Sequence, residues 1–367
     1  MLGVYIHIPF CERKCSYCAF SSFVSSAQEQ ERYISSLIEE IKEFSKNEKR
    51  EIDTIYIGGG TPSLISIDLM KKLIKCLKEN FIWSKECEFS IEANPNSLTE
   101  EKLKFYKQNG INRLSIGVQS LDNAKLQAVG RLHSKEDAIK TLKLAERYFD
   151  NISVDMLIGL PYMNKDLFLN EIEYLSTLNI KHISAYMLQI EEGTQMAELV
   201  DKNEVLLPSD DDSVLAYEEM AKLLKIKGFD RYEVSNFARK GFECRHNIKY
   251  WTGEEYVGFG LAAHSYLKGE RIANSNKFND YYQRKLSIRE KLTKMQLIEE
   301  HIMLGLRCNS GVNKNYLKTL GYDLEKNQYL QDFIAKGIIT ETENEKIYIN
   351  PDFYGVNNYI IVHLLPN

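Results

Sequence analysis

Short apolar runs alternate with longer amphipathic stretches through the first half of the chain. The short runs are rich in β-branched and aromatic residues, as buried strands are; they span Val4–Ile8, Thr54–Ile57, Glu88–Glu92, Arg113–Val118, Ile152–Ile158 and His182–Leu188. Between them, apolar residues recur at helical spacing over Glu29–Phe44, Leu69–Asn80, Glu100–Asn109, Lys135–Tyr148 and Leu167–Leu178. The pattern therefore predicts a strand followed by a helix, repeated along the chain.

Strands that alternate with helices form a parallel sheet with right-handed crossovers. An open doubly wound sheet and a full or partial barrel both satisfy this pattern. Polar residues recur at the C-terminal end of nearly every predicted strand, which is where barrels build their sites. We therefore predict an α/β protein whose core, residues 1–207, is a partial (β/α)6 barrel.

The second half of the chain has a different pattern. Ser209 precedes three aspartates and predicts a helix cap before an amphipathic stretch. The glycine- and aromatic-rich residues from Gly228 to Tyr266 are predicted to be irregular. We expect the barrel and this extension to form one domain over residues 1–286.

The last 81 residues, 287–367, predict a separate small domain. Two amphipathic stretches, Leu297–Leu306 and Gln328–Lys336, precede a hairpin that turns near Asn344. Two helices followed by a hairpin predict an α+β domain that resembles a winged helix. It has no cluster of lysine and arginine, which speaks against DNA binding.

Composition narrows the classes of function. The 367 residues carry 47 lysines and arginines against 52 aspartates and glutamates, and this net charge of −5, without a basic block, argues against a nucleic-acid partner. No apolar run approaches the roughly 18 residues of a membrane span, and no secretory signal is recognisable. The seven cysteines are odd in number and unevenly spaced, unlike a disulfide scaffold. We expect a cytoplasmic protein.

Three of the seven cysteines, Cys11, Cys15 and Cys18, fall within eight residues directly after the first predicted strand. Three thiolates at these spacings can converge on a metal centre. Zinc prefers four ligands, and no second pair of cysteines or histidines stands nearby at finger spacing. An iron–sulfur cubane with three cysteines leaves one iron open to a substrate or cofactor. A zinc site and a plain reduced surface loop are the alternatives.

This Cys-x3-Cys-x2-Cys motif after a first strand resembles the signature of radical S-adenosylmethionine (SAM) enzymes. The opening YIHIPFCERKCSYCAF and the later segments GGGTPS, EANP, GVQS and D-x3-GLP resemble the coproporphyrinogen III dehydrogenase group over nearly the whole chain. The resemblance implies a [4Fe-4S] cluster held by Cys11, Cys15 and Cys18. It also implies that SAM binds the open iron, and that an electron donor reduces the cluster.

The resemblance further implies which residues contact one or two SAM molecules: Tyr5, Gly59, Gly60, Thr61, Glu92, Gln119, Arg131 and Asp155, with Tyr17 packed near the adenine. From the residues alone, the glycines of the GGG turn allow close backbone approach, so their N–H groups can meet a carboxylate or an amino group. Glu92 can accept hydrogen bonds from ribose hydroxyls. Asp155 faces either the barrel interior or the helices.

Two features separate this chain from the dehydrogenases. They carry a further cysteine two residues after the third ligand, where this chain has Phe20. The segment His246-Asn247-x2-Tyr250-Trp251 instead resembles the HNxxYW signature of the heme-chaperone (HemW) branch of the same group. That branch implies heme as cargo and acceptor heme proteins as partners, including respiratory enzymes at the membrane, where the protein would bind peripherally. Oxygen-independent coproporphyrinogen III dehydrogenase, acting through a 5′-deoxyadenosyl radical in heme biosynthesis, is the alternative function.

Heme binding needs an apolar slot, often a histidine or cysteine ligand, and cations for the propionates. His246 lies beside Cys244 and Arg245 and close to two aromatic residues, and is the candidate heme ligand. A core histidine within an aromatic stripe explains the same pattern equally well. Three other histidines rank lower as heme ligands: His133, His182 and His264.

Overall fold

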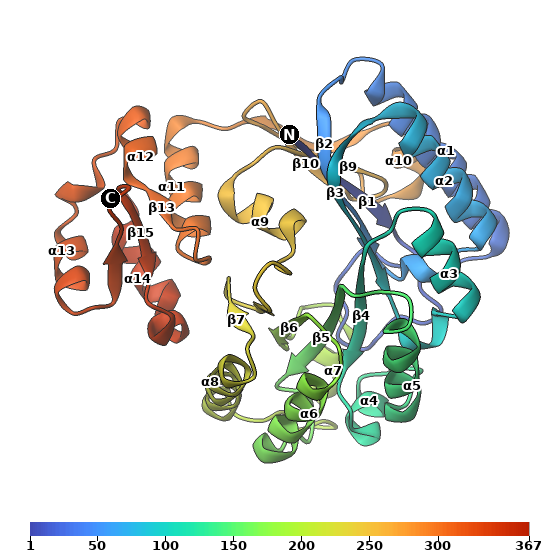
Figure 1. The fold of residues 1–367 in the computed structure, drawn as a ribbon, viewed down its shortest axis with the longest axis horizontal. Coiled ribbons are helices and arrows are strands. Elements are labelled where there is room, and N and C mark those ends of the chain that lie inside the picture. Colours follow the sequence, from blue (N-terminus) through green and yellow to red (C-terminus); the bar gives the residue numbers. More distant parts are fainter. Residues whose placement is uncertain (367) are drawn as a thin grey trace.

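The computed structural model describes residues 1–366, which form a large curved sheet with helices on its outer face and a smaller unit at the C-terminal end of the chain (Figure 1). The strand order of the large sheet is β12-β11-β10-β9-β1-β2-β3-β4-β5-β6-β8-β7. Over the described residues the two edges of this sheet are not hydrogen-bonded to each other. The sheet is therefore open, as expected for a partial barrel.

The first six strands are parallel and alternate with helices, as predicted. The strands are β1 (Leu2–Ile8), β2 (Glu51–Gly59), β3 (Ile82–Ala93), β4 (Arg113–Gln119), β5 (Ile152–Ile158) and β6 (His182–Met187). The helices between them are α1 (Ala27–Ser45), α2 (Ile67–Asn80), α3 (Glu100–Gln108), α4 (Asn123–Ala128), α5 (Lys135–Ala145) and α6 (Lys165–Thr177). The six-residue helix α4 was not predicted, because it is too short for a periodic pattern.

The pleat of each strand separates two environments. In β1, Val4, Ile6 and Ile8 are fully buried and belong to the main hydrophobic core, which the outer helices cover. Tyr5 and His7, at the alternate positions, point to the opposite face of the sheet, because neighbouring side chains on a strand point in opposite directions. The concave side of the sheet is therefore lined by polar and aromatic side chains.

The second half of the large sheet is built by shorter elements. They are α7 (Gln195–Asp201), α8 (Asp210–Ile226), β7 (Asp230–Arg231), β8 (Asn236–Ala238), α9 (Arg245–Thr252), β9 (Tyr256–Phe259), β10 (His264–Leu267), β11 (Glu270–Asn274), α10 (Phe278–Tyr282) and β12 (Leu286–Lys291). Ser209 caps α8 as predicted, because its side chain accepts a hydrogen bond from the backbone N–H of Asp212.

The prediction of irregular structure from Gly228 to Tyr266 is wrong. This segment contains α9 and β9, and β9 pairs in parallel with β1, so that Gly3 lies opposite Tyr256. The strand has only four residues and contains Gly258, where an added Cβ would lie 2.2 Å from the carbonyl oxygen of His264. A strand this short, with a glycine required by close packing, carries no readable alternation.

The C-terminal unit has its own hydrophobic core, which includes Ile302, Leu317 and Phe333. Its elements are α11 (Lys294–Gly305), β13 (Val312–Asn313), α12 (Lys314–Leu320), α13 (Gln328–Ala335), β14 (Ile339–Glu341), β15 (Lys346–Ile349) and α14 (Asn357–Leu364). The hairpin of β14 and β15 turns where predicted. The domain boundary at residue 287 stays a prediction; β12, which crosses it, pairs with β11 in the large sheet.

Within residues 1–366, no helix combines the length and the apolarity that a membrane crossing requires.

A buried carboxylate holds the loop that follows β4. Glu171 on α6 accepts hydrogen bonds from the Ser120 hydroxyl at 2.9 Å and from the Leu121 N–H at 2.7 Å, and its other oxygen lies 3.1 Å from the ammonium of Lys125. Glu171 and Lys125 are both buried. This loop leads on to Arg131, so the buried ion pair positions a predicted site residue.

We predict that Glu171→Ala destabilises the protein by about 3 kcal/mol, because it leaves the Lys125 ammonium buried with only Asp122 nearby, 3.7 Å away. Urea unfolding followed by circular dichroism measures this loss. Glu173→Ala on the same helix removes only the exposed pair with Lys227 and should change stability by less than about 1 kcal/mol. Equal effects of the two substitutions would contradict the role given to Glu171.

Candidate functional site

The cysteine loop follows β1 at the C-terminal edge of the parallel sheet. Its two ends pair with each other: the Cys11 N–H donates to the carbonyl oxygen of Phe23 at 2.9 Å, and the Phe23 N–H donates to that of Pro9 at 2.7 Å. Its tip is held from both sides at Ser16, whose N–H donates to Val129 and whose carbonyl accepts from the Met196 N–H. The loop is thus closed by bonds between its own ends and fixed by backbone bonds to two other segments.

The three loop cysteines are partly exposed, whereas the other four cysteines are buried. The Thr61 hydroxyl lies 3.6 Å from the Sγ atom of Cys11, and Nη1 of Arg131 lies 3.6 Å from the Sγ atom of Cys15. Donors aimed at sulfur stabilise its thiolate form, the form that binds metals. A Cβ added at Gly60 would lie 3.0 Å from Cys11 Sγ. Because glycine lacks this atom, the GGG turn can pack directly against the thiol.

The three partly exposed thiols fit the donor set of an iron–sulfur cluster. Among residues 1–366, no three histidine, cysteine or acidic side chains are arranged to hold one metal ion. A cubane binds each thiolate through a different iron, so its ligands need not meet at one point. Burial, together with the neighbouring Cys15 and Cys18, raises the pKa of the Cys11 thiol, and the Thr61 hydroxyl opposes this shift. A bound cation would relieve the repulsion among the three thiolates.

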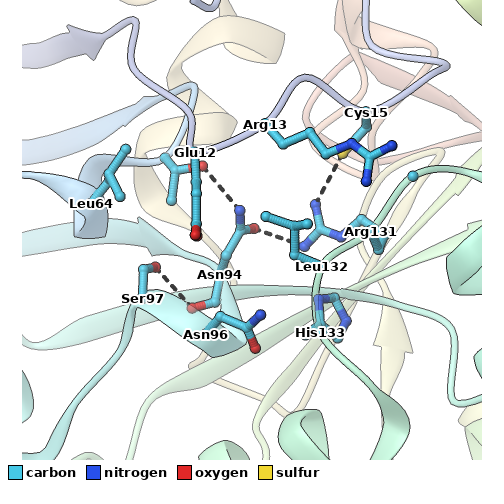
Figure 2. A pocket seen from close by; sticks show the side chains of 12 residues that line it. Glu12, Arg13, Cys15, Leu64, Asn94, Asn96, Ser97, Arg131, Leu132 and His133 are labelled. Atoms are coloured by element: carbon cyan, nitrogen blue, oxygen red, sulfur yellow. Dashed lines mark hydrogen bonds between the residues drawn. The ribbon is translucent and has the colours of Figure 1, made fainter. Parts of the chain in front are cut away.

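Arg131 joins the cysteine loop to the strand ends. Figure 2 shows its guanidinium between Asn94 and Cys15: Nη2 donates to Oδ1 of Asn94 at 2.8 Å and to the carbonyl oxygen of Gly117 at 2.5 Å. Its buried Nε atom has no partner within the described residues. These side chains, with Thr61, line a small pocket beside Cys15. The pocket thus offers a cation and an unused donor next to the cysteine loop.

Asn94 was missed as a site residue. Besides accepting from Arg131, its amide Nδ2 donates to the Thr61 hydroxyl at 3.0 Å, so it links two predicted residues. The EANP segment marked its position, but a sequence motif alone does not show which residues its amide reaches.

The N–H groups of the GGG turn are hydrogen-bonded to other parts of the protein. The N–H of Gly59 donates to Glu92 at 3.0 Å, that of Gly60 to the carbonyl oxygen of Ile8 at 2.9 Å, and that of Thr61 to Phe10 at 2.8 Å. In this structure Gly59 and Gly60 therefore donate their N–H groups to protein acceptors, and the expectation that these groups meet a ligand stays a prediction. The close packing of the turn brings β2 against the cysteine loop, and the assignment of Gly59, Gly60 and Thr61 to the SAM site remains a prediction.

Two carboxyl groups lie on the concave side of the sheet. Glu92 accepts hydrogen bonds from Gly59 and from the Tyr56 hydroxyl at 3.0 Å. Burial, and then the charge of Asp155, raise the pKa of Glu92 to about 7. Asp155 accepts from the Ser115 hydroxyl at 3.1 Å, and burial raises its pKa too. Asp155 therefore faces the barrel interior, which answers the question that the sequence left open.

The remaining predicted SAM residues surround this interior. The Tyr5 hydroxyl is hydrogen-bonded to Nδ1 of His7 at 2.9 Å, and burial raises the pKa of Tyr5. Tyr17 packs against a small cluster that contains Val129 and Leu160. Gln119 ends β4 with φ at +69°, a conformation that side chains other than glycine rarely adopt. Such outliers concentrate at functional sites.

The structure separates His246 from this edge of the sheet and buries it completely. Its Nδ1 atom is 2.8 Å from the Thr54 hydroxyl, and its Nε2 atom is 2.8 Å from the Tyr250 hydroxyl. Burial, together with Lys249 and Arg113, lowers the pKa of His246 to about 3. With both ring nitrogens hydrogen-bonded and no exposed surface, His246 is not available to iron in this conformation.

The three other histidines named as heme ligands are no better placed. His133 is hydrogen-bonded to the Val118 carbonyl group at 3.0 Å and is buried. His182 is fully buried, with Nδ1 2.7 Å from the Ser153 hydroxyl and Nε2 2.8 Å from the Tyr232 hydroxyl. His264 is exposed and lies at the start of β10. None of these three lies in an apolar slot of the kind that heme requires.

Comparison with known proteins finds relatives that match nearly the whole chain. The sequence profile of the radical SAM superfamily matches residues 5–175. The heme chaperone HemW of Bacillus subtilis is 35% identical over 94% of this chain and 94% of its own length. That of Lactococcus lactis is 38% identical over 84% of this chain and 82% of its own. The chain belongs to the HemW family of radical SAM proteins.

The fold agrees with this membership. The solved structure of coproporphyrinogen III oxidase (HemN) from Escherichia coli superimposes on 99% of this chain and 90% of that protein with a TM-score of 0.85. The two sequences are 21% identical, so this likeness concerns the fold alone. As a radical SAM protein, a member of the HemW family is implied to carry a [4Fe-4S] cluster and SAM. The three-cysteine loop beside Arg131 offers this cluster a set of thiols.

We predict that Cys15→Ser abolishes most of the cluster, because a hydroxyl is a poor replacement for a thiolate ligand of iron. Iron content and visible absorbance after anaerobic reconstitution measure the loss. Cys76→Ala is the matched control: this buried thiol lies on α2 in the main core and should leave the cluster intact. A full cluster in the Cys15→Ser protein would refute the ligand assignment.

Proposed function

We propose that the protein is a heme chaperone that carries a [4Fe-4S] cluster and SAM and transfers heme to acceptor heme proteins. The observation that carries this proposal is the identity of 35% to the Bacillus subtilis heme chaperone across 94% of both chains. The Lactococcus lactis relative of the same name is 38% identical over 84% of this chain. The HNxxYW segment, whose resemblance points to the same branch, lies on helix α9.

In this proposal Cys11, Cys15 and Cys18 bind the cluster, which when bound supplies one-electron chemistry to SAM. The contacts of Thr61 and Arg131 with two of these sulfurs favour thiolates. Arg131 also has its free Nε donor for an anionic group of SAM.

Further residues around the barrel interior would complete the SAM site. Glu92 and Asp155 are the carboxylates that can accept hydrogen bonds from hydroxyl groups, and Tyr5 and Gln119 border the same interior. Tyr17 would pack against the adenine, because its ring already belongs to an apolar cluster beside the cysteine loop. These assignments rest on the family resemblance together with the placement of the side chains.

The alternative is oxidative decarboxylation of coproporphyrinogen III. The fold suits this reaction as well, since coproporphyrinogen III oxidase has the same architecture. Phe20 argues against it: where the dehydrogenases are expected to have a further cysteine, this chain has an aromatic side chain that is 70% exposed. Such a side chain cannot supply a thiol for chemistry.

The partners follow from the proposed transfer. Acceptor heme proteins, including respiratory enzymes at a membrane, would receive the cargo from a cytoplasmic chaperone that binds peripherally. A reduced electron donor would act at the cluster. The chain has neither a basic block nor a net positive charge, which supports proteins and heme rather than nucleic acid as partners.

The decisive experiment exposes one reconstituted sample to two ligands. We expect hemin to bind with a stable Soret band, and we expect anaerobic incubation with SAM, a reductant and coproporphyrinogen III to give no decarboxylated product. Absorbance spectroscopy measures the first reaction and chromatography the second. Product formation would overturn the chaperone proposal in favour of the dehydrogenase.

We predict that SAM binding to the reconstituted protein depends on pH through Glu92. Because the pKa of Glu92 is raised to about 7, this group is protonated below pH 7, and a ligand that donates hydroxyls to the carboxylate must displace that proton. The affinity should rise by up to about tenfold per pH unit below pH 7 and level off above it. Isothermal titration calorimetry between about pH 6 and pH 8 measures the profile.

Glu92→Gln should remove this pH dependence, since glutamine does not titrate. Glu86→Gln, an exposed position on the same strand, should retain the profile of the unmodified protein. A flat profile in the unmodified protein would exclude Glu92 from the SAM contacts.

A further inference from the structure

A groove of about 530 Å³ lies between the large sheet and the C-terminal unit. Its walls come from α9 and the β9–β11 strands on one side and from α11, α12 and the β13–β15 sheet on the other. Figure 1 shows α9 between the barrel and this unit. The volume falls within the range of small-molecule and cofactor sites. The SAM site described above does not use this groove.

Aromatic rings line both walls of the groove. Tyr250, Trp251 and Tyr256 come from the sheet side, and the rings of Tyr250 and Tyr256 meet edge to face with centroids 4.5 Å apart. Tyr316 faces them from the C-terminal unit, where its ring lies 4.8 Å from that of His301. Two opposed sets of aromatic rings suit a flat ligand with a large apolar surface.

One end of the groove favours anions. Lys346 lines it, is exposed, and has no ion-pair partner within the described part of the chain. Nε2 of the adjacent His301 accepts the Asn313 N–H at 2.9 Å, so the proton of the neutral ring is on Nδ1, which can donate to a ligand. Burial keeps His301 neutral by lowering its pKa. A carboxylate placed here would meet an ammonium and an N–H donor.

The other charged groups of the groove are paired. Arg271 lies 2.9 Å from Glu300, and Glu254 lies 2.8 Å from the buried ammonium of Lys249. Neither acidic group is therefore a free negative charge that would repel a carboxylate, and Arg271 keeps further N–H donors. The groove is thus apolar along its walls and cationic at the Lys346 end.

The groove and the cysteine loop lie at opposite edges of the parallel sheet. Tyr256 pairs with Gly3 at the start of β1, whereas Cys11 follows the end of that strand at Ile8. The five residue-to-residue steps from Gly3 to Ile8 span about 17 Å. A hydrogen atom can be transferred only between groups in near contact. A ligand in the groove is therefore out of reach of chemistry at the cluster. This placement suits cargo, which is carried unchanged, and does not suit a substrate of the radical.

We propose that this groove is the porphyrin site, in which the aromatic walls cover the macrocycle and Lys346 and His301 bind a propionate. This inference rests on the proposed function, because it names where the chaperone holds its cargo. It also gives the HNxxYW segment a role without His246 as an iron ligand. Tyr250 and Trp251 form the groove wall, and His246 is a positioning residue that holds the Tyr250 hydroxyl from inside the fold.

The test titrates the full-length protein with hemin, with protoporphyrin IX and with its dimethyl ester, which has no free propionate. Tyr316→Ala, at a side chain that is 40% exposed, should lower the affinity for all three ligands about threefold to tenfold. Lys346→Glu should lower the affinity for hemin and for protoporphyrin IX about tenfold and leave the affinity for the dimethyl ester unchanged. Lys326→Glu, at a lysine 82% exposed outside the groove, is the matched control and should bind all three like the unmodified protein.

The selective effect of Lys346→Glu on the acids excludes general damage to the fold, because damage would weaken the ester too. If the unmodified protein binds hemin but both groove variants bind it equally well, the groove is refuted while the chaperone function stands. If the unmodified protein binds none of the three ligands, the proposed function itself fails. If Lys346→Glu lowers the affinity for the ester as much as the affinity for the two acids, the propionate contact is refuted.

Discussion

The parallel pairing of β1 with β2 on one side and β9 on the other is the constraint on which the rest of the structure depends. The C-terminal end of β1 delivers the three-cysteine loop, and its first residues pair with β9, whose Tyr256 lines the groove. Parallel pairing requires both faces of the sheet to be covered, and the helices cover only one of them. The concave face is therefore filled by polar and aromatic side chains, which is costly unless they bond to one another.

Buried charged and aromatic side chains cluster on that face. Arg113 is 1% exposed, and its charge lies close to Glu88, Tyr56 and Cys244. Glu88 in turn accepts the backbone N–H groups of Arg245 and His246 and so anchors the start of α9. The charge of Glu88 favours the charged form of Arg113, whose Nε and Nη1 atoms have no hydrogen-bond partner within the described residues, and the backbone contacts of Glu88 position helix α9 beside the groove.

Contacts continue through this cluster from one edge of the sheet to the other. Glu92 accepts from the Tyr56 hydroxyl, the Tyr56 ring stacks on His246 with centroids 5.4 Å apart, and His246 bonds to Tyr250 in the groove wall. The predicted SAM side and the groove are thus joined by direct contacts among buried groups.

The sequence by itself determined the features that depend on neighbours along the chain: the alternation of strands and helices, the Ser209 cap, the β14–β15 hairpin and the cysteine spacing. Periodicity, caps and metal-ligand spacing are local properties, so they can be read before folding. Only the tertiary structure decided that Asn94 meets Arg131, that His246 is enclosed, and that Tyr256 faces Tyr316 across a groove. These placements depend on pairings between distant segments, such as the four-residue β9 with β1, whose energy is gained only when the whole sheet assembles.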